Sequence, residues 1–344
     1  MPSIWVIELT LKTYVTSRIL LTIPMILLLF TFVFIIVRIL PGDPAAAHFE
    51  KSVDPLVLQE FRHRLGLDAD PFTQYFAYLG GIPFGNFGLS MQDFSPISSH
   101  IAIRFPATLE LTIYAMLFAV LFGVALGVQS AKKYDTVQDH GIRFFGIVTY
   151  AIPVFFLGMI LQFIFSIWLG FLPTGTRFDP RYDAPTTITG LYTIDSLLTG
   201  NIQAFVISIR YLLLPSITLG LILCGIFIRL TRTNMLETLR MDFVVAAEAR
   251  GLSEAKVTYG YALKNAFLPI LTMIGLQFAA LLAGAILTET TFSWPGLGTY
   301  LVQRINHRDY TAIQGVVVFF GILVSLVTLF VDILYAYLDP RIRL

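Results

Sequence analysis

Long apolar runs that carry almost no charge are the feature that most restricts how this chain can fold. They occupy residues 19–40, 107–130, 144–170, 211–230, 267–288 and 313–337. About 20 apolar residues in a helix cross the hydrocarbon core of a bilayer, and helices satisfy their own backbone hydrogen bonds in lipid. Only 13% of the residues are charged, against about 25% in a typical soluble domain. The sequence therefore predicts an all-α integral membrane protein with six transmembrane helices, located in the cell membrane.

The distribution of Lys and Arg predicts the orientation of these helices. Short cytoplasmic segments carry an excess of basic residues. With both termini inside, more than half of the 23 basic residues fall on short inner segments, including the pair Lys132–Lys133. The predicted organisation is a cytoplasmic N-terminus (1–18), a first transmembrane helix (19–40), an extracytoplasmic loop region (41–105), a transmembrane core (106–338) with an outer insertion (171–210) and a cytoplasmic loop (231–265), and a cytoplasmic tail (339–344). The apolar stretch Ala204–Ile209 is too short to cross and is expected to lie shallowly in the membrane surface.

The sequence lacks the motifs of common catalytic sites. There is no G-x-x-x-x-G-K-[ST], H-E-x-x-H or G-x-S-x-G, and no two histidines have metal-ligand spacing. We therefore expect no catalytic, cofactor or metal site, no enzymatic activity, and no hydrolysis of ATP by this chain itself. The net charge of +1 indicates no nucleic-acid surface.

Charged residues are also rare within the apolar runs. Glu110, Glu289 and Asp332 fall near the ends of the runs, where water at the interface is expected to solvate them. Carboxylates in the middle of a membrane span are usually kept for ion coupling. Their scarcity argues against a secondary transporter or a channel, which remains the alternative class.

The cytoplasmic segment between Arg229 and Lys264 is predicted to form two helices joined by a turn. Strong helix-forming residues run to Arg250, and Gly251 is the type of residue found just past a helix end. Ser253 is a suitable N-cap for a second helix, which would run to Pro269 at the start of the next span. The result is a bent helical elbow under the membrane.

The elbow combines small and apolar residues with charged ones. Phe243, Val244, Ala247 and Leu252 lie beside Arg240, Asp242, Glu248 and Arg250. One interpretation is an amphipathic helix at the lipid headgroups. The other is a docking surface for a cytoplasmic partner, favoured because alanines allow close approach to the backbone. The expected docking residues are Ala246, Ala247, Glu248, Ala249, Arg250, Gly251, Leu252 and Ser253.

These residues also carry a family resemblance. The stretch 246–253, followed by residues 262–269, resembles the cytoplasmic coupling loop of ABC importer permeases, in the form found in the dipeptide/oligopeptide/nickel transport group. Similar agreement is found at Leu40–Pro44, Leu65–Asp68, Gly85–Ser90, Arg104–Leu111, Glu289–Gly298 and Asp339–Arg341. These motifs occur in the order of that group and span nearly the whole chain.

The resemblance implies a permease subunit of the type I ABC importer architecture, of the first-permease type with a long outer loop after its first transmembrane helix. It implies a second homologous permease, two cytoplasmic P-loop ATPase subunits that hold ATP and Mg²⁺, and an extracytoplasmic solute-binding protein as partners. Dipeptides or oligopeptides are the first expected substrates, with oligosaccharides or nickel chelates as alternatives. Residues 176–210 form a longer segment than the group leads us to expect, and we expect it to affect docking of the binding protein.

Overall fold

The computed structural model of the chain describes residues 11–39, Ala45, Phe49 and 54–338. Within this part the chain is helical, with one isolated β-bridge between Leu89 and Pro96. The motifs Leu40–Pro44 and Asp339–Arg341, the tail 339–344 and most of the predicted N-terminal segment lie outside the described residues.

In the described part of the chain, five helical segments are long and apolar enough to cross a membrane, or six if one bent pair of helices is counted as a single span. The long helices are α1 (Leu11–Ile39), α5 (Ile97–Lys132), α9 (Ile202–Leu239), α11 (Leu263–Gly284) and α14 (Tyr310–Leu338). The bent pair is α6 (Val137–Ala151) and α7 (Val154–Gln162), which continues as η2 (Phe163–Trp168). Each of the six predicted apolar runs overlaps one of these segments over most of its length, which confirms the all-α membrane fold.

The third predicted span is two helices rather than one. Their axes differ by 103° at Ile152 and Pro153, and Pro153 is the N-cap of α7. A proline disfavours helical backbone at the residue before it. Ile152 accordingly has an extended conformation with ψ of 129°. The span predicted over residues 144–170 therefore breaks in the middle.

The stretch Ala204–Ile209 is not a separate element, and its depth in the membrane stays a prediction. These residues form the first turns of α9, whose amino end is capped by Asn201, with its side-chain oxygen 2.9 Å from the Ala204 amide. At about 1.5 Å per residue, the 38 residues of α9 extend roughly 57 Å, well beyond the hydrocarbon thickness. The apolar stretch looked too short only because polar residues separate it from the rest of its helix.

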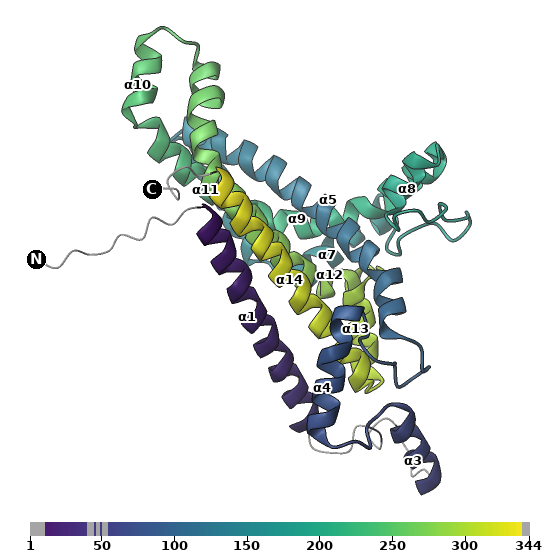
Figure 1. Cartoon of the computed structure of the whole chain (residues 1–344). Helices are drawn as coiled ribbons and strands as arrows, with labels where there is room; N and C mark the ends of the chain where they lie inside the picture. Colours follow the sequence, from purple (N-terminus) through teal and green to yellow (C-terminus); the bar gives the residue numbers. More distant parts are fainter. Residues whose placement is uncertain (1–10, 40–44, 46–48, 50–53, 339–344) are drawn as a thin grey trace, which may run out of the picture.

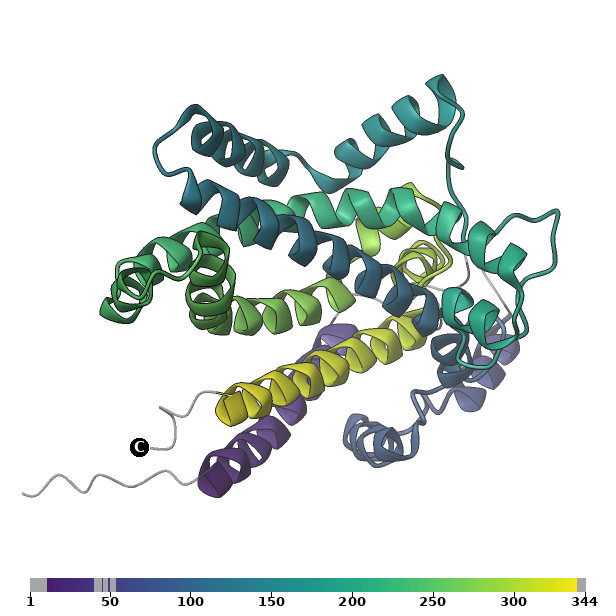
Figure 2. The ribbon, with the colours of Figure 1, turned by 90° about the horizontal axis from the view of Figure 1, so that it is seen from above.

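Small residues let α5 and α9 pack closely along their length. A Cβ on Gly123 would lie 2.5 Å from Cβ of Phe227, and one on Gly127 would lie 2.5 Å from Cβ of Thr231. Such small residues, four apart, are a common device of membrane helix packing. Seen from above in Figure 2, α6 and α7 lie on one side of this central pair, while α1 and α14 lie on the other.

The start of α1 and the end of α14 lie at the same end of the molecule (Figure 1). Arg18 of α1 pairs with Asp332 of α14 at 3.3 Å. The short helix α10 (Asp242–Ala249) projects at this end, while α3 (Pro55–Arg64), α4 (Pro71–Gly81), η1 (Ile82–Phe84) and α13 (Leu297–Asn306) lie at the opposite end. This arrangement agrees with a cytoplasmic elbow on the same side as both termini; the absolute orientation stays a prediction.

Candidate functional site

The elbow consists of α10, a glycine turn, and a helix that continues into the next span. α9 ends at Leu239, and α10 follows after Arg240 and Met241. The amide of Gly251 donates to the Glu248 carbonyl at 2.8 Å, and the amide of Leu252 donates to the Ala247 carbonyl at 3.4 Å. Gly251 has a φ of +74°. This pair of bonds with a left-handed residue is a Schellman motif, so the predicted helix end at Gly251 is confirmed.

The second helix of the elbow does not stop at Pro269. Residues Lys256–Ala262 form a π-helical segment (η3) that leads directly into α11, and Pro269 lies within α11. The Ser253 carbonyl accepts the first bond, from the Val257 amide at 3.0 Å. The elbow is therefore joined to a membrane-spanning helix with no intervening loop, as a stiff connection requires.

One face of the elbow is buried against the protein itself. Val244 is fully buried, and Ala247 is 2% exposed. They pack in a cluster with Val128 and Ala131 of α5 and Met235 of α9. Of the expected docking residues, Ala247 is therefore covered by the ends of α5 and α9, and its side chain is not available on the free surface of the elbow.

The opposite face of the elbow is open. Val245 and Phe243 are 55% and 38% exposed. Leu252 is half-buried. The remaining predicted docking residues are exposed, namely Ala246, Glu248, Ala249, Arg250, Gly251 and Ser253. Small, apolar and charged side chains thus form one free surface at the tip of the molecule, which we call the outer face of the elbow.

Two ion pairs hold the elbow and its supporting helices in place. Lys132 at the end of α5 lies 2.8 Å from Glu254 at the start of the second elbow helix. Arg232 of α9 forms two bonds to Asp139 of α6, at 2.8 and 2.7 Å, and Asp139 also accepts from Ser130. A bidentate pair of this kind fixes geometry as well as charge. The elbow is consequently tied to α5, and α9 to α6.

Comparisons with known proteins identify the family. Residues 119–344 match the model of the binding-protein-dependent transport system inner membrane component, and residues 11–112 match the model of the amino-terminal part of such membrane components. The chain is 42% identical to a di/tripeptide transport system permease protein of Pseudomonas aeruginosa, over 96% of this chain and 98% of the relative. It is 37% identical to a dipeptide transport system permease protein of Escherichia coli K12, with the same coverage.

The chain is an ABC importer permease. The resemblance predicted from the coupling-loop motif and the outer motifs is thus confirmed, as is the multi-pass location in the cytoplasmic membrane. The relatives also include a glutathione transport system permease protein of Salmonella choleraesuis, 37% identical over 330 residues, 96% of this chain and 98% of the relative.

Two of the motifs that carry the resemblance meet in the permease around a buried carboxylate. Glu289 of α12 (Ile286–Thr291) is fully buried and accepts from the Thr108 hydroxyl at 2.5 Å and the Thr299 amide at 2.9 Å. A Cβ on Gly296 would lie 2.2 Å from its Oε1. Glycine in this motif therefore makes room for the carboxylate. Burial raises the pKa of Glu289 to about 7 from its ordinary 4.5.

A second buried carboxylate joins the outer insertion to α5. Glu110 is 2% exposed and accepts two bonds from Arg177, at 3.0 and 2.6 Å. Its other oxygen accepts from the amide and hydroxyl of Thr193, at 2.8 and 2.7 Å. Arg177 also stacks on Tyr192 of α8 (Tyr192–Leu198), with its guanidinium 3.7 Å from the ring centre. The predicted outer insertion is therefore fixed by hydrogen bonds to the half of α5 that lies away from the elbow.

These networks correct the expectation that Glu110 and Glu289 are solvated at the interface. Both side chains are enclosed by protein and paired through hydrogen bonds. Asp332, in contrast, is partly exposed and pairs with Arg18, in line with the prediction. The motifs that contain Glu110 and Glu289 lie far apart in the sequence, and neither gave a local sign that its carboxylate would be covered. Among the described residues, no group of three acidic, His or Cys side chains has a geometry suited to a metal ion.

Proposed function

We propose that this permease imports short peptides and is driven by ATP that separate subunits hydrolyse. It forms the translocation pathway with a second homologous permease, two cytoplasmic P-loop ATPase subunits bind ATP and Mg²⁺, and an extracytoplasmic binding protein delivers the peptide. The outer face of the elbow carries this proposal. It is exposed, projects at the tip of the molecule, and continues into α11 without a loop. Movement of an ATPase subunit docked there would be transmitted to α11 as a rigid-body displacement.

Peptides are the favoured substrates because relatives of nearly full coverage are named for dipeptides, di/tripeptides and glutathione. Oligosaccharides and nickel chelates remain alternatives within the same transport group. Uptake of a labelled dipeptide, a disaccharide and a nickel–histidine complex into proteoliposomes would separate them. These should contain the chain, its second permease, its ATPases and its binding protein.

A bulky residue on the outer face of the elbow tests the docking role. Ala249 is exposed and takes no part in the buried cluster beneath the elbow. Ala249→Trp should leave the fold intact and weaken ATPase docking, because the indole would separate the two surfaces. We expect at least a tenfold fall in both copurified ATPase and dipeptide uptake.

Val137→Trp provides the matched control. Val137 is 89% exposed at the start of α6, on the same end of the molecule but outside the elbow. Its replacement should leave ATPase copurification and uptake unchanged. Normal copurification and uptake in Ala249→Trp would refute docking at the elbow.

A further inference from the structure

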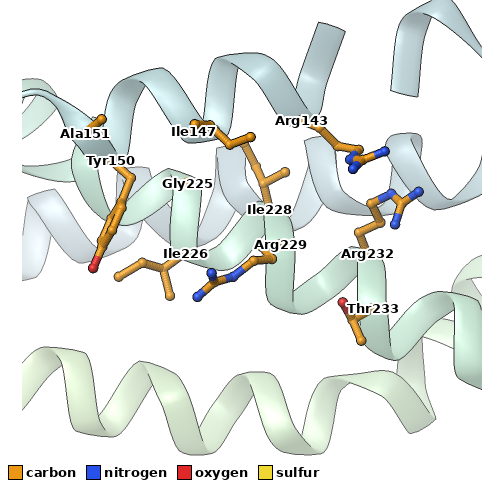
Figure 3. A pocket seen from close by; sticks show the side chains of 11 residues that line it. Arg143, Ile147, Tyr150, Ala151, Gly225, Ile226, Ile228, Arg229, Arg232 and Thr233 are labelled. Atoms are coloured by element: carbon orange, nitrogen blue, oxygen red, sulfur yellow. The ribbon is translucent and has the colours of Figure 1, made fainter. Parts of the chain in front are cut away.

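A cavity of about 430 Å³ lies between α6 and α9, and Figure 3 shows it from close by. This volume is within the range of small-molecule sites in proteins. Apolar residues form most of its lining, including Ile147 and Tyr150 of α6 and Ile226 of α9. Three arginines and one threonine complete the lining. The cavity is therefore a groove with apolar walls and basic groups at its edges.

Two contacts fix how α6 and α9 lie along the groove. Arg232 of α9 bonds to Asp139 near the start of α6. Gly146 is seven residues after Asp139, and Gly225 is seven residues before Arg232. A Cβ on Gly225 would lie 2.3 Å from the carbonyl oxygen of Gly146, so the two backbones touch there. The helices are thus antiparallel, and the groove has a rigid base.

One end of the groove lies where α6 begins and α9 approaches its own end, and we call it the elbow end. Arg143 directly precedes the apolar run 144–170, and Arg232 follows the apolar run 211–230. Such a boundary between basic and apolar sequence is typical of the headgroup level of a bilayer. From Arg143 to Tyr150, α6 rises about 10 Å, whereas half of a hydrocarbon core is about 15 Å thick. The groove therefore fits within a single leaflet.

The elbow end carries a positive charge that the described residues do not neutralise. Figure 3 shows the guanidinium groups of Arg143 and Arg232 at this end. Arg232 donates to Asp139 through Nε and Nη2, which leaves Nη1 without a partner in the part of the chain that the structure describes. Arg143 is exposed and makes no hydrogen bond, ion pair or ring contact within that part. Two guanidinium groups and one carboxylate leave a net charge of +1, which one anionic group would complement.

Arg229 belongs to the opposite end of the groove. Its side chain extends away from that of Arg143 in Figure 3. A helical side chain leans toward the amino end of its own helix, and α6 and α9 run in opposite directions. Arg143 therefore points toward the elbow end, and Arg229 points away from it. Arg229 also has no partner among the described residues, so it is a matched control for charge in the same groove.

We propose that this groove binds one anionic phospholipid. The phosphate lies between Arg143 and Nη1 of Arg232, and one acyl chain lies over Ile147 and Tyr150, which are 66% and 61% exposed. A soluble anion would use only the basic end and leave these apolar side chains uncovered, whereas a phospholipid matches both parts of the groove. The membrane in which the permease is embedded supplies this ligand. The site does not depend on which solute is imported.

Photolabelling tests the site directly. The permease, purified with the subunits that accompany it, is reconstituted in phosphatidylcholine with a trace of phosphatidylglycerol that carries a diazirine in one acyl chain. After irradiation, labelled residues are located by peptide mass spectrometry. Labelling at Tyr150 should exceed that at Leu28 of α1, 72% exposed and outside the groove, at least tenfold. Excess unlabelled phosphatidylglycerol should abolish the label at Tyr150, and added phosphatidylcholine should not.

Three variants assign the charge. Arg143→Gln should reduce labelling at Tyr150 about tenfold, to the level of Leu28. Arg143→Lys keeps the charge and should retain part of the labelling. Arg229→Gln removes the same group at the opposite end and should label as the wild type does. Melting temperatures within a few degrees of the wild type would establish that the variants fold.

Four outcomes would overturn the proposal. One is equal labelling of Tyr150 and Leu28 in the wild type, and another is an equal effect of Arg143→Gln and Arg229→Gln. Competition by water-soluble glycerophosphoglycerol as effective as that by the whole lipid would assign the basic end to a soluble anion. Labelling of the chain alone, but not of the chain with its accompanying subunits, would show that a partner covers the groove. Since no transport is measured, failure of the proposed function would leave these results unchanged.

Discussion

The buried pair Glu110–Arg177 allows a quantitative test of how the outer insertion is held on the membrane core. Glu110→Gln keeps the shape of the side chain but removes its charge, so the guanidinium of Arg177, 7% exposed, loses the carboxylate with which it pairs. Removing one member of a buried pair costs about 3–5 kcal/mol, because the other charge stays buried without compensation. The cost falls on the segment around Arg177 and Thr193, which contacts α5 through this carboxylate.

Limited trypsin digestion measures this local loosening. Arg181 lies in the insertion, and its side chain is 81% exposed, so cleavage there reports opening of the segment. A loss of about 3 kcal/mol corresponds to roughly a 100-fold larger open population, and cleavage by dilute protease follows that population. We therefore expect cleavage after Arg181 to be about two orders of magnitude faster in Glu110→Gln than in the wild type.

The control is the same substitution in an exposed pair. Glu60 and Arg64 pair at 2.9 Å on α3, with 66% and 59% of their side chains exposed. Glu60→Gln should change stability by no more than about 0.5 kcal/mol and leave the cleavage rate at Arg181 unaltered. Wild-type cleavage in Glu110→Gln would refute the reasoning. Additional replacement of Arg177 by Met should restore much of the loss, because no uncompensated charge then remains.

Two further predictions concern other buried residues. Ala247→Leu should lower the free energy of unfolding by about 1–3 kcal/mol, because Ala247 is only 2% exposed beneath the elbow and has no room for a larger side chain. Thermal melting in detergent checks this, with Ala249→Leu at an exposed position as the control. Equal melting temperatures of the two variants would contradict the burial of Ala247. Glu289 has its pKa raised from 4.5 to about 7, so the folded state holds the proton more tightly. The free energy of unfolding should therefore fall as pH rises from about 4.5 to 7, by roughly 3 kcal/mol at about 1.4 kcal/mol per pKa unit, and level off above. Melting between pH 5 and 8 should show this slope in the wild type and lose it in Glu289→Gln; an unchanged slope would exclude Glu289 as its source.

Local features of the sequence were sufficient for the helices and for the family. Apolar runs predict transmembrane helices because crossing a bilayer demands a long segment with little charge. Gly251 predicts a helix end because the backbone is left-handed there, which glycine adopts most readily. The sequence places Pro153 within a single predicted span. The structure adds a 103° bend there, which is explained by the restriction that Pro153 imposes on the backbone of Ile152. The docking role of residues 246–253 stays a prediction, although their contiguous pattern was enough to predict the helical elbow that contains them.

The surroundings of each residue were decided by the tertiary structure alone. Sequence could not tell that Ala247 faces α5 while Ala249 is exposed, because small residues occur on every side of α10. Nor could it tell that residues 67 positions apart, Glu110 and Arg177, would neutralise one another away from water. The apolar spans establish that this chain is embedded in a lipid bilayer, since the solvent in which a helix is stable depends on the composition summed along that helix. Which side chains meet depends on the helix that lies opposite, and that is settled only when the helices pack.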